Sequence, residues 1–117
     1  MPHTYSNRKR GRTRIWFVPR LWELSENLTA KRVKISSLSP SNFTGTIWFK
    51  KSPTFTQVLQ HMQDVLTVDL RYPIILDPSG NIMDGYHRVT KALLLGKKTI
   101  LVKQFDELPL PDKIDQV

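Results

Sequence analysis

The 117-residue sequence contains no cysteine, and this absence excludes several kinds of chemistry. Disulfide bonds, thiolate metal sites and cysteine nucleophiles all require that residue. A chain without disulfides fits a reducing compartment, so we expect a cytoplasmic location. Long apolar runs are also missing, so no segment is expected to span a membrane. The basic N-terminus is not followed by an apolar stretch, which argues against a secretory signal.

Acidic residues are absent from the first twenty positions, and the positive charge is concentrated there. This segment carries six Lys and Arg residues, and therefore +6 of the net charge of +8. The rest of the chain is nearly neutral. Two interpretations stay open for residues 1–14: a flexible, solvated tail, or an arm that neutralises nucleic-acid phosphates. The cations of this arm are Arg8, Lys9, Arg10, Arg12 and Arg14.

The spacing of apolar residues predicts one α+β domain over residues 15–110, between the basic arm and a C-terminal tail at 111–117. Ser52 and Pro53 form a predicted helix start, and Gly96 a predicted helix end. The expected elements are a helix at about 19–28, a strand at 32–36, a long loop at 37–51, a helix at about 53–67, a hairpin of 72–76 with 82–83, a helix ending at Gly96 and a strand at 99–103.

Apolar side chains at helical spacing predict which helix faces are buried. In the first helix, Trp22 is expected to join the leucines of the buried face. In the second helix, His61 falls on the polar side, and the predicted buried face consists of Phe55, Val58, Leu59, Met62, Val65 and Leu66. Trp48 and Phe49 in the long loop fit either core packing or stacking on a ligand. No clustered His and Asp spacing typical of a zinc or iron site is evident.

The run Asp84-Gly85-Tyr86-His87-Arg88 lies at the predicted turn from a strand into a helix. The first N–H groups of a helix have no partner inside it and carry the positive end of its dipole, so they favour an anion. His87 and Arg88 add donors suited to phosphate oxygens. Gly85 would let a phosphate approach the backbone closely. Asp84 is placed to hold a magnesium ion or to accept a proton.

Each of these residues also has a structural explanation. Asp84 is a common type of helix N-cap, and Gly85 suits a tight turn. His87 fits a surface histidine, and Arg88 a partner of Asp84 or Glu26. Together, at one strand-to-helix turn, the residues favour phosphate binding. Asp77 lies in an Asp-Pro-Ser-Gly turn, where turn formation is the commoner role.

Roughly residues 31–105 resemble the ParB/sulfiredoxin superfamily. The resemblance rests on Tyr72-Pro-Ile-Ile-Leu, the motif Asp84-Gly-Tyr-His-Arg, Ala92, Gly96 and Lys98-Thr-Ile-Leu-Val-Lys. It implies a mixed sheet flanked by helices and a turn that binds the phosphates of ATP or CTP with Mg²⁺. The motif is most similar to the D-G-H-H-R form of free serine kinases, with Tyr86 in place of the first histidine.

By this resemblance, Gly85, Tyr86, His87 and Arg88 would bind the nucleotide, Asp84 and His87 would be catalytic, and Asp84 would hold the metal. Tyr86 stands where sulfiredoxins have their cysteine, so sulfinic-acid reduction is excluded. The kinases also use a glutamate outside the motif, and neither Glu23 nor Glu26 aligns with it clearly.

We therefore expect a nucleotide-binding domain that acts as a small-molecule phosphotransferase or NTPase, or as a non-catalytic switch of a protein contact or homodimer. The alternative is a non-catalytic, nucleic-acid-associated accessory protein that uses the basic arm.

Overall fold

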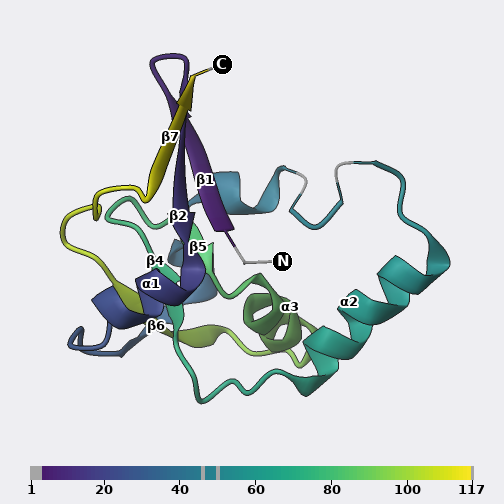
Figure 1. Cartoon of the computed structure of the whole chain (residues 1–117). Coiled ribbons are helices and arrows are strands. Elements are labelled where there is room, and N and C mark those ends of the chain that lie inside the picture. The colour runs from purple at the N-terminus through teal and green to yellow at the C-terminus, as the bar shows by residue number, and fades with distance from the viewer. Residues whose placement is uncertain (1–3, 46, 50, 117) are drawn as a thin grey trace.

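The computed structural model describes residues 4–45, 47–49 and 51–116, and it has an α+β fold, as predicted (Figure 1). The elements are β1 (Thr4–Lys9), β2 (Arg12–Phe17), α1 (Val18–Leu24), β3 (Lys31–Lys34), the 3₁₀ helices η1 (Ile35–Ser37) and η2 (Pro40–Phe43), α2 (Phe55–Thr67), β4 (Ile74–Leu76), β5 (Ile82–Asp84), α3 (Tyr86–Leu94), β6 (Thr99–Gln104) and β7 (Lys113–Gln116). The described helices are all too short or too polar to cross a membrane.

A mixed four-stranded sheet, in the order β3-β6-β4-β5, forms the centre of the fold. β4 and β6 are parallel, and the other two pairs are antiparallel. Side chains alternate between the faces of a strand, so Ile74 and Leu76 point to one face and Ile75 to the other. Val89 and Ala92 of α3 join the first two in one apolar cluster. The predicted hairpin of 72–76 with 82–83 is confirmed as β4 and β5.

The opposite face of the central sheet is covered by the N-terminal part of the chain. Trp16 of β2 and Leu21 of α1 are fully buried there, together with Ile75 and Met83. α1 ends at Leu24, before the predicted end at residue 28. Trp22 does not join this core: the residue is 55% exposed, contrary to the prediction.

A second sheet, in the order β1-β2-β7, contains most of the predicted flexible arm and C-terminal tail. The prediction of a flexible segment is wrong for residues 4–14, which form a hairpin with its turn at Arg10 and Gly11. These two residues have φ angles of 53° and 74°, the positive values that a tight two-residue hairpin turn requires. Tyr5 packs against the buried Trp16, which anchors the hairpin to the core. In Figure 1, β1, β2 and β7 project together from the rest of the fold.

Helix α2 lies beside α3 at the edge of the molecule (Figure 1). It begins at Phe55, after a capping box formed by Thr54 and Gln57, so the predicted start at Ser52 and Pro53 is wrong. Of the apolar face predicted for this helix, only Val65 is buried; the exposed residues of that face are Phe55, Val58, Leu59, Met62 and Leu66.

Candidate functional site

The turn from β5 into α3 depends on Gly85. This residue is the N-cap of α3 and has a φ of 120°, a conformation that other residues rarely adopt. A Cβ atom at this position would also lie only 2.7 Å from the Cβ of Ile74. Glycine is therefore required for the turn and for the close approach of α3 to β4. Since Gly85 is the N-cap and no side chain caps the helix, Asp84 does not serve as the cap.

A cavity of about 470 Å³ opens at this turn. The whole predicted motif, residues 84–88, lines it. Trp22 of α1, Trp48 of the loop before α2 and His61 of α2 contribute to the other walls. The structure thus brings the five residues of the motif to one cavity, which we call the α3 cavity.

Asp84 is oriented by Trp22, whose indole Nε1 donates a hydrogen bond of 2.8 Å to the carboxylate Oδ2. Among the described residues, no hydrogen-bond donor contacts the second carboxylate oxygen. Asp84 therefore combines a fixed position at the end of β5 with one oxygen that can bind a cation or accept a proton. The sequence did not predict this contact, because Trp22 and Asp84 are far apart in the chain.

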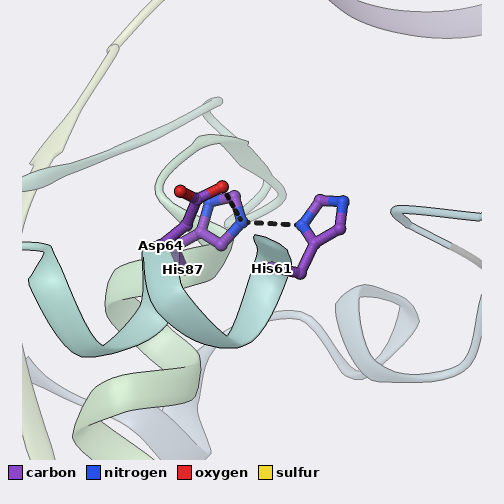
Figure 2. A group of neighbouring side chains, drawn as sticks. All are labelled: His61, Asp64 and His87. Carbon is purple, nitrogen blue, oxygen red and sulfur yellow. Dashed lines mark hydrogen bonds and ion pairs between the residues drawn. The ribbon is translucent and has the colours of Figure 1, made fainter. Parts of the chain in front are cut away.

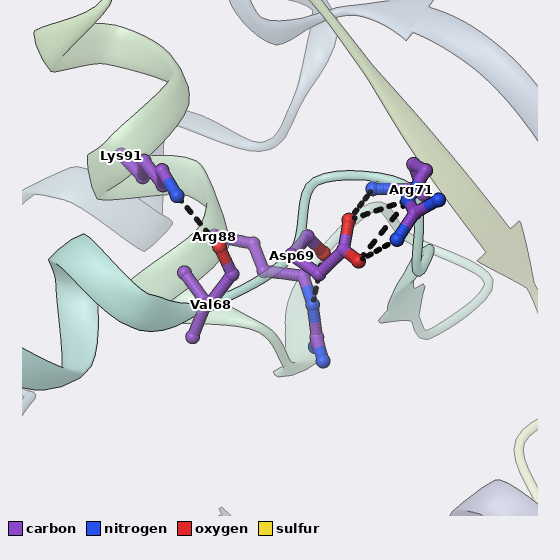
Figure 3. Close-up of polar contacts among 5 residues, drawn as sticks. All are labelled: Val68, Asp69, Arg71, Arg88 and Lys91. Carbon is purple, nitrogen blue, oxygen red and sulfur yellow. Dashed lines mark hydrogen bonds and ion pairs between the residues drawn. The ribbon is translucent and has the colours of Figure 1, made fainter.

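The Arg88 side chain is held by the segment that joins α2 to β4 (Figure 3). Its Nε donates to the backbone oxygen of Asp69 at 3.2 Å, and its guanidinium carbon lies 5.9 Å from the centre of the Tyr72 ring. Neither Asp84 nor Glu26 pairs with it in the described part of the chain. The terminal nitrogens of the guanidinium group have no hydrogen-bond partner among the described residues, so the fork is available to an anion.

Tyr86 has a structural contact that the sequence did not predict. Its hydroxyl donates to the backbone oxygen of Asn42 at 3.2 Å and so connects α3 to η2. Burial raises the pKa of the Tyr86 phenol above its ordinary value of 10.0, so the group stays protonated near neutral pH. Tyr86 therefore contributes a ring to the cavity wall, while its hydroxyl holds the η2 segment.

His87 meets two residues of α2 (Figure 2). Its Nε2 lies 3.0 Å from Nδ1 of His61 and 3.9 Å from Oδ2 of Asp64. One potential ligand atom from each of the three side chains lies within 4.8 Å of the others. The sequence showed no clustered His and Asp spacing and did not predict this grouping. The only local signal was the i, i+3 spacing of His61 and Asp64, which places both on one face of α2.

The remaining residues singled out by sequence lie elsewhere. Asp77 is a turn residue: its carboxylate accepts hydrogen bonds from the backbone N–H groups of Ser79 and Asn81 and from the Asn81 amide. The cations of the basic arm lie on the β1–β2 hairpin, where four of them surround a surface hollow of about 510 Å³ together with Ile114: Lys9, Arg10, Arg12 and Arg14. Arg8 is on the other face of the hairpin, opposite Thr13.

Comparison with known proteins gives no match: no family model fits the chain, and no curated protein or solved structure is significantly similar to it. The resemblance to the ParB/sulfiredoxin superfamily therefore stays a hypothesis based on the motif.

Proposed function

We propose that the chain binds the phosphate groups of a nucleotide, ATP or CTP, in the α3 cavity. One observation carries this proposal: the start of α3, Arg88 and two tryptophans, Trp22 and Trp48, line a single cavity. Its volume of about 470 Å³ is within the range of roughly 300–1,000 Å³ that is usual for small-molecule sites.

Each part of the cavity suits one part of a nucleotide. Backbone N–H groups at the start of α3 and the Arg88 fork suit phosphate oxygens. The indoles of Trp22 and Trp48 offer flat apolar surfaces for a base. The second oxygen of Asp84 suits Mg²⁺ bound to the phosphates.

Phosphoryl transfer would extend this binding function to an enzymatic one. Transfer depends mainly on positioning and charge stabilisation, for which a cation and one proton acceptor are needed. Among the described residues that line the cavity, Asp84 is the only carboxylate, and neither Glu23 nor Glu26 is present. The second oxygen of Asp84 would either hold Mg²⁺ or accept the proton of a substrate hydroxyl. The terminal phosphoryl group would pass to the oxygen of this small alcohol, and the nucleoside diphosphate would leave.

The proposal is tested by titrating ATP and CTP, each with Mg²⁺, into the wild-type chain and into Arg88→Ala. We expect at least about tenfold weaker binding by the variant, since a charge-assisted contact is lost. Arg71→Ala is the matched control, because Arg71 lies in the α2–β4 segment that Arg88 contacts, has a side chain 91% exposed and does not line the cavity. Equal affinity of Arg88→Ala and wild type, or no binding of either nucleotide at millimolar concentration, would contradict the proposal. Phosphate release in the same samples separates an enzyme from a binding protein.

The basic hairpin supports a second candidate function, nucleic-acid binding. Lys9 pairs with Arg12 across the hairpin, and Arg14 follows two residues later on the same face. Arg10 is at the tip. Cations gathered on one face in this way would contact nucleic-acid phosphates. This function uses a different surface and is compatible with the first.

A salt titration tests this second function. Binding of duplex DNA and of RNA is measured by fluorescence anisotropy at several salt concentrations. Replacing Lys9 and Arg12 by Gln should reduce the slope of log K against log salt by about 2, since two phosphate contacts are lost. The control replaces the exposed Lys97 and Lys98 by Gln, which removes the same charge elsewhere. Equal slopes for the two double variants would exclude the hairpin as the nucleic-acid interface.

A further inference from the structure

The side chains of His61, Asp64 and His87 form a cluster where α2 packs against α3, which we call the His–Asp–His cluster. We propose that this cluster binds a divalent transition-metal ion, and that Zn²⁺ fits it best. The proposal does not depend on nucleotide binding, because it rests on the three side chains alone.

The spacing of the donor atoms supports the proposal. In a tetrahedral zinc site with bonds of about 2.0 Å, neighbouring ligand atoms are about 3.3 Å apart. The observed separations are 3.0 Å from His87 Nε2 to His61 Nδ1 and 3.9 Å from His87 Nε2 to Asp64 Oδ2. These two values lie on either side of the ideal one, and all three ligand atoms lie within 4.8 Å of one another. Side-chain rotations that bring Asp64 closer to both imidazoles would complete the geometry. Figure 2 shows the carboxylate and the His61 ring directed toward the same nitrogen of His87.

The two imidazole rings are already arranged in the way that a shared ion needs. Their planes differ by only 14°, and their centres are 5.2 Å apart. Together with the 3.0 Å contact between the nitrogens, these values mean that the rings meet edge to edge, with nitrogen facing nitrogen. A metal ion binds imidazole nitrogen in the plane of the ring. A small outward shift of the two nitrogens would thus open a shared position for an ion.

Trp48 covers one side of this junction. Its ring centre lies 4.8 Å from that of each imidazole, and its plane is within 15° of both. Because the imidazoles lie side by side, a ring equally close to both must lie over the edge where they meet. The indole therefore limits the access of water to the cluster from that side. A drier environment strengthens the binding of a cation to its ligands.

Contacts around the cluster hold its carboxylate in place. Gln60 donates to Oδ1 of Asp64 at 3.1 Å, which leaves Oδ2 directed toward His87. Such secondary hydrogen bonds commonly orient the ligands of metal sites. The Asp64 and His87 side chains are 42% and 24% exposed, so an ion can reach the cluster from solvent.

The donor set determines the class of ion. Two imidazoles and one carboxylate suit Zn²⁺ and related transition metals, whereas Mg²⁺ prefers oxygen ligands throughout. Three protein ligands leave a fourth tetrahedral position for water or an anion, as in catalytic zinc sites. His61 and His87 also line the α3 cavity, so a ligand in that cavity would be close to this position.

The test uses the full chain, freed of metal and without nucleotide. Zn²⁺ is titrated by calorimetry, and Co²⁺ is followed by its visible absorption. We expect one ion per chain and no comparable binding of Mg²⁺. Asp64→Asn and His61→Gln should each weaken Zn²⁺ binding at least about tenfold, since loss of even an outer contact typically costs 10–100-fold. In NMR spectra, Zn²⁺ should shift the imidazole resonances of His61 and His87.

His3→Gln is the matched control, because it removes the one other histidine of the chain. It should bind Zn²⁺ like the wild type. Circular dichroism checks that each variant is folded. If His61→Gln does not fold, the Zn²⁺ affinity of Asp64→Asn tests the proposal, because the Asp64 side chain is partly exposed and the substitution keeps its size. The proposal is overturned if the wild type binds no Zn²⁺ or Co²⁺, if Asp64→Asn binds as tightly as wild type, or if His3→Gln abolishes binding. Failure here would leave nucleotide binding through Arg88 unaffected.

Discussion

Helices α2 and α3 lie side by side and are both amphipathic, but they are attached to the molecule in different ways. α3 buries Val89 and Ala92 in the apolar cluster on the central sheet. α2 buries Val65, while several large apolar side chains of the same helix remain exposed. The stability of α3 thus comes from the core, and that of α2 has to come from other contacts.

Polar and aromatic contacts supply much of the attachment of α2. The Lys91 Nζ of α3 donates to the backbone oxygens of Leu66, at 3.1 Å, and Val68, at 2.8 Å, at the C-terminal end of α2. Figure 3 shows the bond to Val68. His61 contacts His87, and both pack against Trp48. His61, His87 and Trp48 therefore position α2 and also line the α3 cavity. Regions with few buried apolar contacts open most readily, so we expect α2 to be the less stable of the two helices.

The largest effect is expected from Gly85→Ala, which disrupts the attachment of α3. Alanine would have to adopt a φ of 120° and would place its Cβ against Ile74. Backbone strain and overpacking together should lower the free energy of unfolding by about 3 kcal/mol. Chemical denaturation measures this change. Gly45→Ala is the control, since a Cβ there meets nothing within 4 Å. Similar stability of both variants would show that α3 does not depend on this close approach.

The same substitution made in each helix compares their attachment directly. Val89 of α3 is 2% exposed and Val58 of α2 is 37% exposed. Val89→Ala should lower the free energy of unfolding by about 2 kcal/mol, because it removes buried methyl groups and leaves a cavity. Val58→Ala should cost less than about 1 kcal/mol. Both values come from denaturant unfolding curves, and equal losses would mean that α2 is packed as firmly as α3.

The sequence predicted the parts of the fold and site that have local signals. The β4–β5 hairpin and the turn at Gly85 follow from short apolar runs interrupted by turn residues. The end of α3 also has a local signal, Gly96, which follows the C-cap Leu95. The N–H of Gly96 bonds to the backbone oxygen of Leu93 and that of Lys97 to the backbone oxygen of Ala92, an arrangement that favours glycine.

The parts that sequence missed depend on contacts between distant segments. The His–Asp–His cluster requires a particular placement of α2 on α3, and only the spacing of His61 and Asp64 is local. The amphipathic period of α2 indicated a face, but not what would cover it. The β1–β2 hairpin did have a local signal, the Arg10-Gly11 turn between strands, but the charge of that segment favoured an interpretation as a flexible arm.

A smaller effect is expected from Lys91→Met, which acts on α2 alone. The change removes the ammonium that caps the carbonyl end of α2 but keeps the long apolar side chain. We expect a loss of about 1 kcal/mol and faster hydrogen exchange of amides in α2. Amides in α3 should exchange as in the wild type. Lys98→Met, at an exposed position, is the control. Equal acceleration in both helices would show that they unfold as one unit.

The smallest effect is expected in the segment that joins α2 to β4. Hydrogen bonds from the Arg71 side chain and backbone lower the pKa of Asp69 from 3.8 to about 2. Because the pKa of Asp69 is lower in the folded state, the contact contributes its full stabilisation of the fold at pH values above 3.8, the pKa in the unfolded state. This contribution is lost as the pH falls toward about 2. The pair is solvated, and the Arg71 side chain is 91% exposed, so the effect on global stability should be small. The carboxyl carbon of Asp69, followed by NMR, should titrate near 2 in the wild type and closer to 3.8 in Arg71→Gln. A wild-type titration midpoint near 3.8 would show that the Asp69–Arg71 pair does not hold the segment between α2 and β4. The position of α2 would then depend on its contacts with α3 and Trp48.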